Sequence, residues 1–271
     1  FFNASGMLSP PKTEVKNRIN LVEFENDTIA TMTSLNGKTI LITGAARRLG
    51  RLFALACARA GADIIIHHAH SDEDAKQVRD EIESIGRNAY ILASDFGTPD
   101  AVSRLISLAN DISPLYALVN SAAVFEPLYF NDTTLDDWNR HLNINLTAPF
   151  LLSQEFARQT NEGCIVNILD WRALRPAADH FPYTISKAAL AAMTKSLAVA
   201  LAPRITVNGL ALGAILPPSD NLSASEKIIE NVPAKRWSEA GEVEEALLFL
   251  LTCPAYITGE IIHVDGGRHL V

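Results

Sequence analysis

The sequence predicts an α/β fold, a single-domain Rossmann-like doubly wound parallel sheet with helices on both faces. Short, continuous apolar runs alternate with longer helical patterns, and strands of this kind are typical of a parallel sheet covered on both sides. The length of 271 residues suits one α/β domain. No internal repeat or linker-like stretch interrupts the alternation after Lys38. Together these observations favour one sheet with right-handed crossovers.

The elements follow one another in order from the first apolar run. Residues 39–43 are β-branched and apolar and end at Gly44, which predicts a strand and a turn. Apolar residues recur at helical spacing over 49–61, which predicts the first helix. Further strands are expected at 62–67, 89–93, 116–120, 164–169, 205–210 and 261–264. Further helices are expected at 72–85, 99–112, 135–160 and 182–201.

The chain is expected to consist of an N-terminal extension and one domain. Residues 1–36 show little periodicity and are interpreted as an N-terminal extension, so the domain is expected at 37–271. Within it, residues 212–237 have the least regular pattern and are expected to cover the substrate.

Composition excludes several classes of protein. A formal charge of -8 argues against a general nucleic-acid or anionic membrane surface. No run reaches the roughly 18 apolar residues of a membrane helix, and no charged segment precedes an apolar one near the start. The cysteines Cys57, Cys164 and Cys253 lie far apart in apolar runs without metal-ligand spacing. We therefore expect a cytoplasmic protein with reduced thiols, no metal, no membrane and no nucleic acid as a partner.

The turn after the first strand carries a phosphate-binding pattern. In Thr43-Gly44-Ala45-Ala46-Arg47-Arg48-Leu49-Gly50, Gly44 permits a tight turn and Gly50 permits close packing of helix on strand. The helix N-terminus then offers N–H groups to a pyrophosphate. Arg48 stands where the usual middle glycine would be. Gly44, Arg47, Arg48, Leu49 and Gly50 are thus candidate cofactor-binding residues, although a purely structural tight turn remains an alternative.

The end of the second strand decides which dinucleotide is expected. An acidic residue there would bind the ribose of NAD, whereas positive and hydrogen-bonding groups accommodate the extra phosphate of NADP. The chain reads His67-His68-Ala69-His70-Ser71 before its first acid, Asp72, and Arg47 can approach from the first turn. The pattern favours NADPH, with His70 and Ser71 as candidate ligands. A polar loop with chance histidines is the alternative.

A phenol and an ammonium lie one helical turn apart in the last long helix. Tyr183 and Lys187 fall on one face of that helix, where a nearby Lys⁺ favours the tyrosinate. We therefore expect Lys187 to lower the pKa of Tyr183, which can then act as a proton donor near neutral pH.

These motifs together resemble the short-chain dehydrogenase/reductase family, from about Leu35 to the end of the chain. The resemblance implies that Asp95 approaches the adenine, that Asn120, in Asn-Ser-Ala-Ala, contributes to the cofactor site and that Lys187 also contacts the cofactor. It further implies that Asn145 holds a water in a proton relay to Lys187. The helices at 135–160 and 182–201 resemble the family's subunit contacts, so a homotetramer is expected by analogy.

One departure from the family pattern concerns the catalytic serine. The family places it thirteen residues before the tyrosine, and that position is Asp170 here. An ionised carboxylate would repel the oxyanion formed during ketone reduction. It suits a substrate with ring N–H and amino groups, or one whose C=N nitrogen must be protonated. A degraded site is the alternative interpretation of Asp170.

Within the family, the Asp170–Tyr183–Lys187 arrangement resembles the pteridine reductases and the dihydromonapterin reductases. In that group an arginine at the position of Arg48 contacts cofactor phosphate and pterin, and an aromatic at the position of Phe125 stacks the pterin against the nicotinamide. Phe125 can also be a plain core aromatic, and Arg48 can serve the pyrophosphate alone. Two departures are Leu212-Gly213 for the family's Pro-Gly, and Ala123 for a serine that many members carry.

The sequence therefore predicts an NADPH-dependent reductase of a pterin-like C=N bond. Its catalytic residues are Asp170, Tyr183, Lys187 and Asn145. Its substrate-binding residues are Phe125, Asp170, Tyr183 and Arg48. A general carbonyl or 3-oxoacyl-thioester reductase and a non-catalytic NADPH-binding regulator remain open.

Overall fold

A computed structural model describes residues 33–98, 102, 104–217 and 228–271. Over these residues, the apolar runs form a seven-stranded sheet in the order β3-β2-β1-β4-β5-β6-β7, and every neighbouring pair is parallel. The strands are β1 (Thr39–Ile42), β2 (Asp63–His68), β3 (Ala89–Ala93), β4 (Leu115–Asn120), β5 (Gly163–Asp170), β6 (Ile205–Leu212) and β7 (Ile261–Val264).

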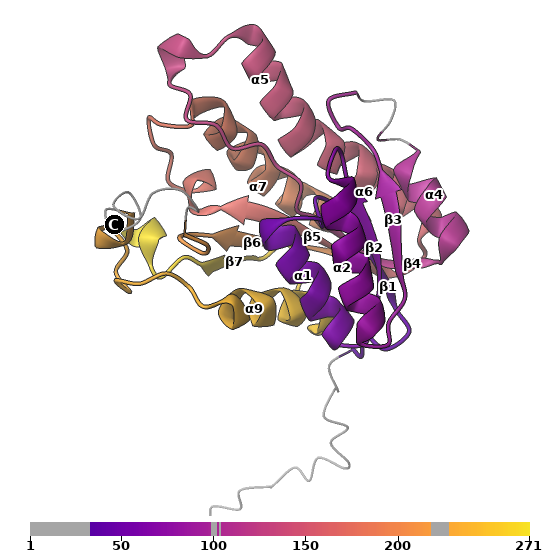
Figure 1. Cartoon of the computed structure of the whole chain (residues 1–271). Coiled ribbons are helices and arrows are strands. Elements are labelled where there is room, and N and C mark those ends of the chain that lie inside the picture. Colours follow the sequence, from indigo (N-terminus) through magenta and orange to yellow (C-terminus); the bar gives the residue numbers. More distant parts are fainter. Residues whose placement is uncertain (1–32, 99–101, 103, 218–227) are drawn as a thin grey trace, which may run out of the picture. The chain divides into compact units, whose positions relative to one another are not determined.

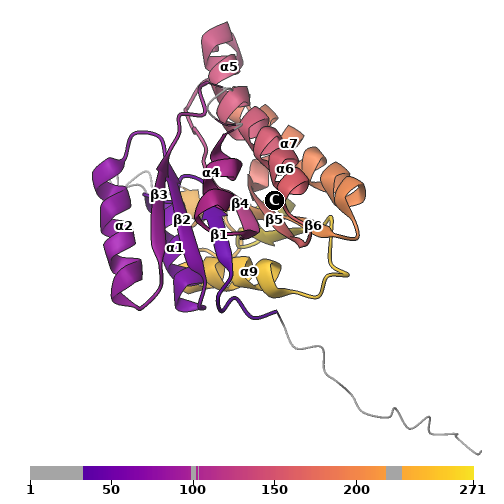
Figure 2. The ribbon, with the colours of Figure 1, turned by 90° about the vertical axis from the view of Figure 1, so that its right-hand side faces the viewer.

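Helices cover both faces of the sheet (Figures 1 and 2). Successive side chains of a strand point to opposite faces, so Ile40 and Ile42 enter one core cluster while Leu41 enters the other. The first cluster packs under α1 (Arg48–Arg59), α2 (Asp72–Ser84) and α9 (Ala240–Thr252). The second packs under α4 (Leu105–Ile112), α6 (Ala148–Gln159) and α7 (Phe181–Leu201). The predicted α/β fold class is confirmed.

The sheet order reverses beside β1, which has β2 on one side and β4 on the other. In open α/β sheets, ligands bind beyond the carboxyl ends of the strands at such a switch point. Here the residues that follow β1 and β4 are joined, because Thr43 Oγ1 accepts hydrogen bonds from the N–H groups of Ser121 and Ala122, both at 2.9 Å.

Several predicted boundaries change. The helix expected at 135–160 is interrupted: α5 (Leu135–Leu142) passes through a π turn at Asn143–Thr147 before α6. Pro149 explains part of this, since it has no N–H to offer the carbonyl of Asn145 in an α-helical pattern. Strand β6 continues to Leu212, two residues past its expected end.

Helix α9 was missed by the sequence analysis. Its buried residues Val243, Leu247, Leu250 and Leu251 follow helical spacing and close the first core cluster. Much of the segment expected to cover the substrate, and the start of the helix expected at 99–112, lie outside the described residues. At the start of the domain, Leu35 is buried and the Thr33 N–H donates to the Thr252 carbonyl, so the folded chain begins before residue 37.

The closest backbone approach in the first turn occurs at Gly50. A Cβ there would lie 2.1 Å from the carbonyl oxygen of Gly44, so the turn and helix α1 would have to separate. We expect Gly50→Ala to cost about 1–3 kcal/mol of unfolding free energy, the range for overpacking a tight contact. Urea denaturation measures it.

Gly241 provides a matched control in helix α9, where an added Cβ meets nothing within 4 Å. Gly241→Ala should leave stability unchanged or raise it by up to about 1 kcal/mol, because alanine has the higher helix propensity. Equal urea midpoints for the two variants would contradict this account of the turn.

Candidate active site

The turn between β1 and α1 has the geometry of an anion site. Gly44 adopts a φ of +67°, and Arg47 precedes α1 without a side-chain cap, so the helix N-terminus keeps N–H groups for a ligand. Arg48 is exposed and takes a φ of +48°, a left-handed conformation that favours glycine. This explains why glycine is usual at that position.

The three histidines at the end of β2 and just beyond it do not act together. His67 is buried, stacks on Phe96 at 4.2 Å between ring centroids and accepts the Gly44 N–H at its Nδ1. Burial lowers the pKa of His67 to about 4, so this ring is neutral. His68 is also buried, and its Nδ1 accepts the N–H of Ser71. Of the three imidazoles, only that of His70 is exposed and can meet a 2′-phosphate.

The exposed groups at this strand end are His70 and Arg47. His70 Nε2 lies 3.3 Å from a carboxylate oxygen of Asp95, which places both residues at the carboxyl ends of β2 and β3. Arg47 Nε donates to Asp74 at 2.6 Å. The Asp74 carboxylate of α2 thus holds Arg47 near the loop that is expected to bind the extra phosphate of NADP.

The predicted catalytic residues meet where β5 ends beside α7. The Tyr183 hydroxyl donates to Asp170 Oδ2 at 3.1 Å. The other carboxylate oxygen of Asp170 accepts the Arg172 N–H at 2.8 Å. Lys187 Nζ donates to the Ile168 carbonyl at 2.7 Å, one helical turn beyond Tyr183. Helix α7 is therefore fastened to β5 by both members of the Tyr–Lys pair.

Burial controls the protonation of this cluster. It raises the pKa of Asp170 from its usual value and lowers the pKa of Lys187 to about 8. It also raises the pKa of Tyr183 well above 10, with the charge of Asp170 as the next cause. The expectation that Lys187 lowers the pKa of Tyr183 is wrong for this structure, because the ammonium faces the Ile168 carbonyl. The phenol keeps its proton at neutral pH.

Phe125 lies beside Tyr183 and is 53% exposed. Its ring meets Tyr183 edge-on at 4.7 Å and stacks nearly parallel to His180 at 4.0 Å. The guanidinium of Arg172 lies 5.7 Å from the Phe125 ring centroid. A half-exposed aromatic ring therefore borders the ring of Tyr183.

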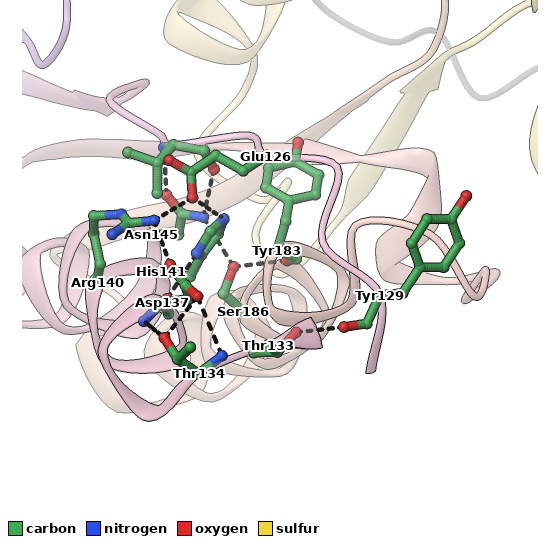
Figure 3. Close-up of polar contacts among 11 residues, drawn as sticks. Glu126, Tyr129, Thr133, Thr134, Asp137, Arg140, His141, Asn145, Tyr183 and Ser186 are labelled. Carbon is green, nitrogen blue, oxygen red and sulfur yellow. Dashed lines mark hydrogen bonds and ion pairs between the residues drawn. The ribbon is translucent and has the colours of Figure 1, made fainter. Parts of the chain in front are cut away.

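Asn145 braces the segment that carries Phe125 (Figure 3). Its side chain accepts the Val124 N–H at 2.9 Å and donates to the Val124 carbonyl at 3.0 Å. It also donates to Ser186 Oγ, whose hydroxyl donates to the Tyr183 carbonyl. Both amide hydrogens are thus used within the protein. The predicted contact of Asn145 with Lys187 through a water remains a prediction.

A charged cluster secures the same segment from its outer side (Figure 3). Arg140 donates to the carboxylates of Glu126, at 2.5 Å, and Asp137, at 2.8 Å. His141 is fully buried, with Nδ1 bonded to the Asp137 carbonyl and Nε2 3.8 Å from Glu126. Helix α5 therefore holds Glu126, the neighbour of Phe125, by charge.

The remaining predicted residues lie near the crevice in supporting roles. Asn120 ends β4, but its side chain is buried and donates to Asn167 Oδ1 at 2.8 Å. Leu49 packs against the first core cluster. Sequence reasoning missed Arg172, Asp179 and His180: Asp179 forms an ion pair with Arg172 at 2.9 Å, and His180 Nδ1 lies within hydrogen-bond distance of the same carboxylate, also at 2.9 Å. They follow no motif, and only the loop after β5 brings them to Asp170.

Known proteins match nearly the whole described domain. Residues 44–269 match the family described as enoyl-(acyl carrier protein) reductase. A 3-oxoacyl-[acyl-carrier-protein] reductase of Synechocystis is 33% identical over 87% of this chain and 98% of its own length. The chain belongs to the short-chain dehydrogenase/reductase family. It is accordingly an oxidoreductase.

Solved structures of this family have the same fold. FolM alternative dihydrofolate reductase 1 of Brucella canis, complexed with NADP, superposes with a TM-score of 0.82 at 31% identity, covering 88% of this chain and 96% of that one. A short-chain dehydrogenase of Burkholderia cenocepacia, also with NADP, gives 0.82 at 33% identity over 87% and 99%.

The brace made by Asn145 generates a stability prediction. Asn145→Ala would leave the N–H and carbonyl of Val124, which are partly buried, without their protein partners, and each unpaired buried group costs about 1–3 kcal/mol. We expect a loss of about 2–4 kcal/mol in urea denaturation. Asn139→Ala, at an exposed position of α5, is the control and should stay within about 0.5 kcal/mol. A loss at Asn145 no larger than that of the control would contradict the brace.

Proposed function

We propose that this protein is an NADPH-dependent reductase that acts on a C=N bond of a pterin-like ring. The observation that carries the proposal is the hydrogen bond between Tyr183 and Asp170, which puts a carboxyl group where the family pattern has a serine. A serine hydroxyl would donate to a ketone oxygen. A carboxylate accepts hydrogen bonds instead, so it matches the N–H and amino groups of a pterin.

The residues at the carboxyl edge of the sheet fit NADP, the cofactor of solved relatives. The uncapped N-terminus of α1 and the glycine turn suit the pyrophosphate. Arg47, Arg48 and His70 are exposed and can meet the extra phosphate. NADPH supplies a hydride when bound, and we assign Lys187 to the nicotinamide side of the site.

The chain's own residues would orient the substrate and supply the proton. Phe125 is half-exposed, and the part of its ring that His180 does not cover would contact a planar heterocycle. Asp170 would bind the polar edge of that ring, while Tyr183, protonated at neutral pH, would donate to the ring nitrogen. After Tyr183 has given up its proton, Asp170 would take a proton from solvent and return it to the phenolate, and its raised pKa favours this nearer to neutral pH than for an ordinary aspartate.

A general 3-oxoacyl-thioester reductase is the second candidate function. The observation in its favour is sequence similarity: a 3-oxoacyl-[acyl-carrier-protein] reductase of Aquifex aeolicus is 35% identical over 86% of this chain and 98% of its own length. Against it stands Asp170, because a buried carboxylate beside the reacting carbonyl would oppose the negative charge that develops on oxygen.

Assembly and location are also proposed. Apolar side chains lie exposed on α5, α6 and α7, including Leu135, Phe150, Ile185 and Val199, which supports a homotetramer built on these helices. Sedimentation equilibrium, which measures the mass of the assembly, can test for the tetramer. Helix α7 is the one described helix long and apolar enough to cross a membrane, but it carries the catalytic pair and packs on the sheet, consistent with a cytoplasmic enzyme.

Oxidation of NADPH with dihydrobiopterin, dihydromonapterin, dihydrofolate and a 3-oxoacyl thioester tests the proposal. We expect turnover of at least one pterin and little of the thioester. Tyr183→Phe should lower kcat by about 10²–10⁴-fold, the usual contribution of a general acid, without loss of cofactor binding. Tyr129→Phe is the matched control, because Tyr129 is exposed, and it should keep wild-type activity.

Asp170→Ser distinguishes the two candidates. It should reduce pterin turnover and raise thioester or ketone reduction, since it restores a hydroxyl donor. The proposal fails if the wild type reduces the thioester but no pterin. Tight NADPH binding without turnover of any substrate would instead support a regulatory protein.

A further inference from the structure

Two carboxylates flank the guanidinium of Arg172 in the loop after β5. Arg172 Nη2 donates to Asp179 Oδ2 at 2.9 Å, whereas Arg172 Nη1 stays 3.8 Å from Asp170 Oδ1, beyond hydrogen-bond distance. The side chains of Arg172 and Asp170 are only 12% and 15% exposed, so solvent screens their charges little. Arg172 therefore pairs with Asp179 and not with the carboxyl group that accepts the Tyr183 hydroxyl.

The guanidinium of Arg172 is able to reach Asp170. Its Nε is buried and has no hydrogen-bond partner among the described residues, so not all of its five N–H donors are used. A movement of roughly 1 Å would bring Nη1 within hydrogen-bond distance of Asp170. The bond to Asp179 opposes this movement.

Asp179 is charged and firmly held. Its Oδ2 also accepts the Nδ1–H of His180 at 2.9 Å, and His180 stacks on Phe125. Burial raises the pKa of Asp179, but the hydrogen bond and the charge of Arg172 outweigh it, so the pKa lies below its usual value. Burial lowers the pKa of His180, so this ring is a neutral donor at neutral pH and leaves the charge of Asp179 to Arg172.

We infer that Asp179 is a positioning residue, which holds the Arg172 guanidinium away from the Asp170 carboxyl group. The inference deepens the proposed function, because that function rests on this carboxyl group. With Arg172 held at Asp179, the effect of burial on Asp170 is not offset by a direct ion pair, and the pKa of Asp170 stays raised.

The other charged or titratable groups that act on Asp170 have their own partners. Lys187 donates to the Ile168 carbonyl, and Arg268 donates to the Ile228 carbonyl. His180 is neutral, and Tyr183 keeps its proton. Arg172 is thus the cation that a second carboxylate draws away from Asp170.

Asp179→Asn tests the inference, since it removes the charge that holds Arg172. A crystal structure of this variant should show Arg172 Nη1 within about 3.2 Å of Asp170. The guanidinium then offsets the charge of Asp170, so the pKa of Tyr183 in ultraviolet titration should fall by about one unit. Comparison with Tyr183→Phe identifies the phenol. Asp111→Asn, which removes an exposed carboxylate of α4, is the matched control and should change neither result.

A double variant separates positioning from the simple loss of one negative charge. In Arg172→Gln, Asp179 has no guanidinium to hold, so adding Asp179→Asn should produce no further fall in the pKa of Tyr183. Asp179→Glu restores the carboxylate and should bring that pKa back toward the wild-type value. Equal falls with and without Arg172 overturn the inference. If Arg172→Gln does not fold, a guanidinium that stays in place in the Asp179→Asn crystal structure overturns it as well.

These measurements need no substrate, so they are independent of the proposed function. With dihydrobiopterin, Asp179→Asn should lower kcat at neutral pH by up to about tenfold, because a lower pKa makes Asp170 a poorer proton acceptor. The KM should stay within about twofold of wild type, and a higher KM at unchanged kcat would count against the inference. Failure of the wild type to reduce any pterin overturns the proposed function alone, whereas an unmoved pKa of Tyr183 in Asp179→Asn overturns the inference alone.

Discussion

The site depends on one hydrogen bond, from the Tyr183 hydroxyl to the Asp170 carboxylate at the end of β5. With the contact from Lys187 to the Ile168 carbonyl, it fastens one face of α7 to one strand. The same bond sets the chemistry, because the charge of Asp170 adds to burial in raising the pKa of Tyr183. The phenol is therefore protonated at neutral pH, as the proposed role of Tyr183 as proton donor requires.

Around that bond, the fold fixes the aromatic ring of Phe125 at the carboxyl edge of the sheet, beside Tyr183. The π turn in the long helix brings Asn145 against the backbone of Val124, and Ser186 links the same amide to the carbonyl of Tyr183. Phe125 is held between these contacts and the charged cluster at Glu126. The position of Phe125 relative to Tyr183 is therefore fixed by hydrogen bonds to the neighbouring backbone, which restrain it more than the packing of its exposed ring does.

The strands and the site cluster were predictable from sequence because their signals are local. Continuous apolar runs are what a doubly covered parallel sheet requires, and Tyr183 with Lys187 share a helical face. The helical spacing of Val243 and Leu247 also indicates α9. This helix was missed because it follows an irregular segment. Burial was not predictable: His67 is neutral because it is buried, and it stacks on Phe96 from the segment after β3. The direction of the pKa shift at Tyr183 likewise depends on desolvation, which no spacing reveals.

The central claim is that the Asp170 carboxylate holds the proton on Tyr183. Ultraviolet titration of tyrosine ionisation tests it in the wild type and in Asp170→Asn, each compared with the same protein carrying Tyr183→Phe so that one phenol is isolated. The account predicts that Tyr183 in the wild type ionises well above the ordinary value of about 10 and that Asp170→Asn brings its pKa down toward that value. An unchanged or higher pKa in Asp170→Asn would contradict it.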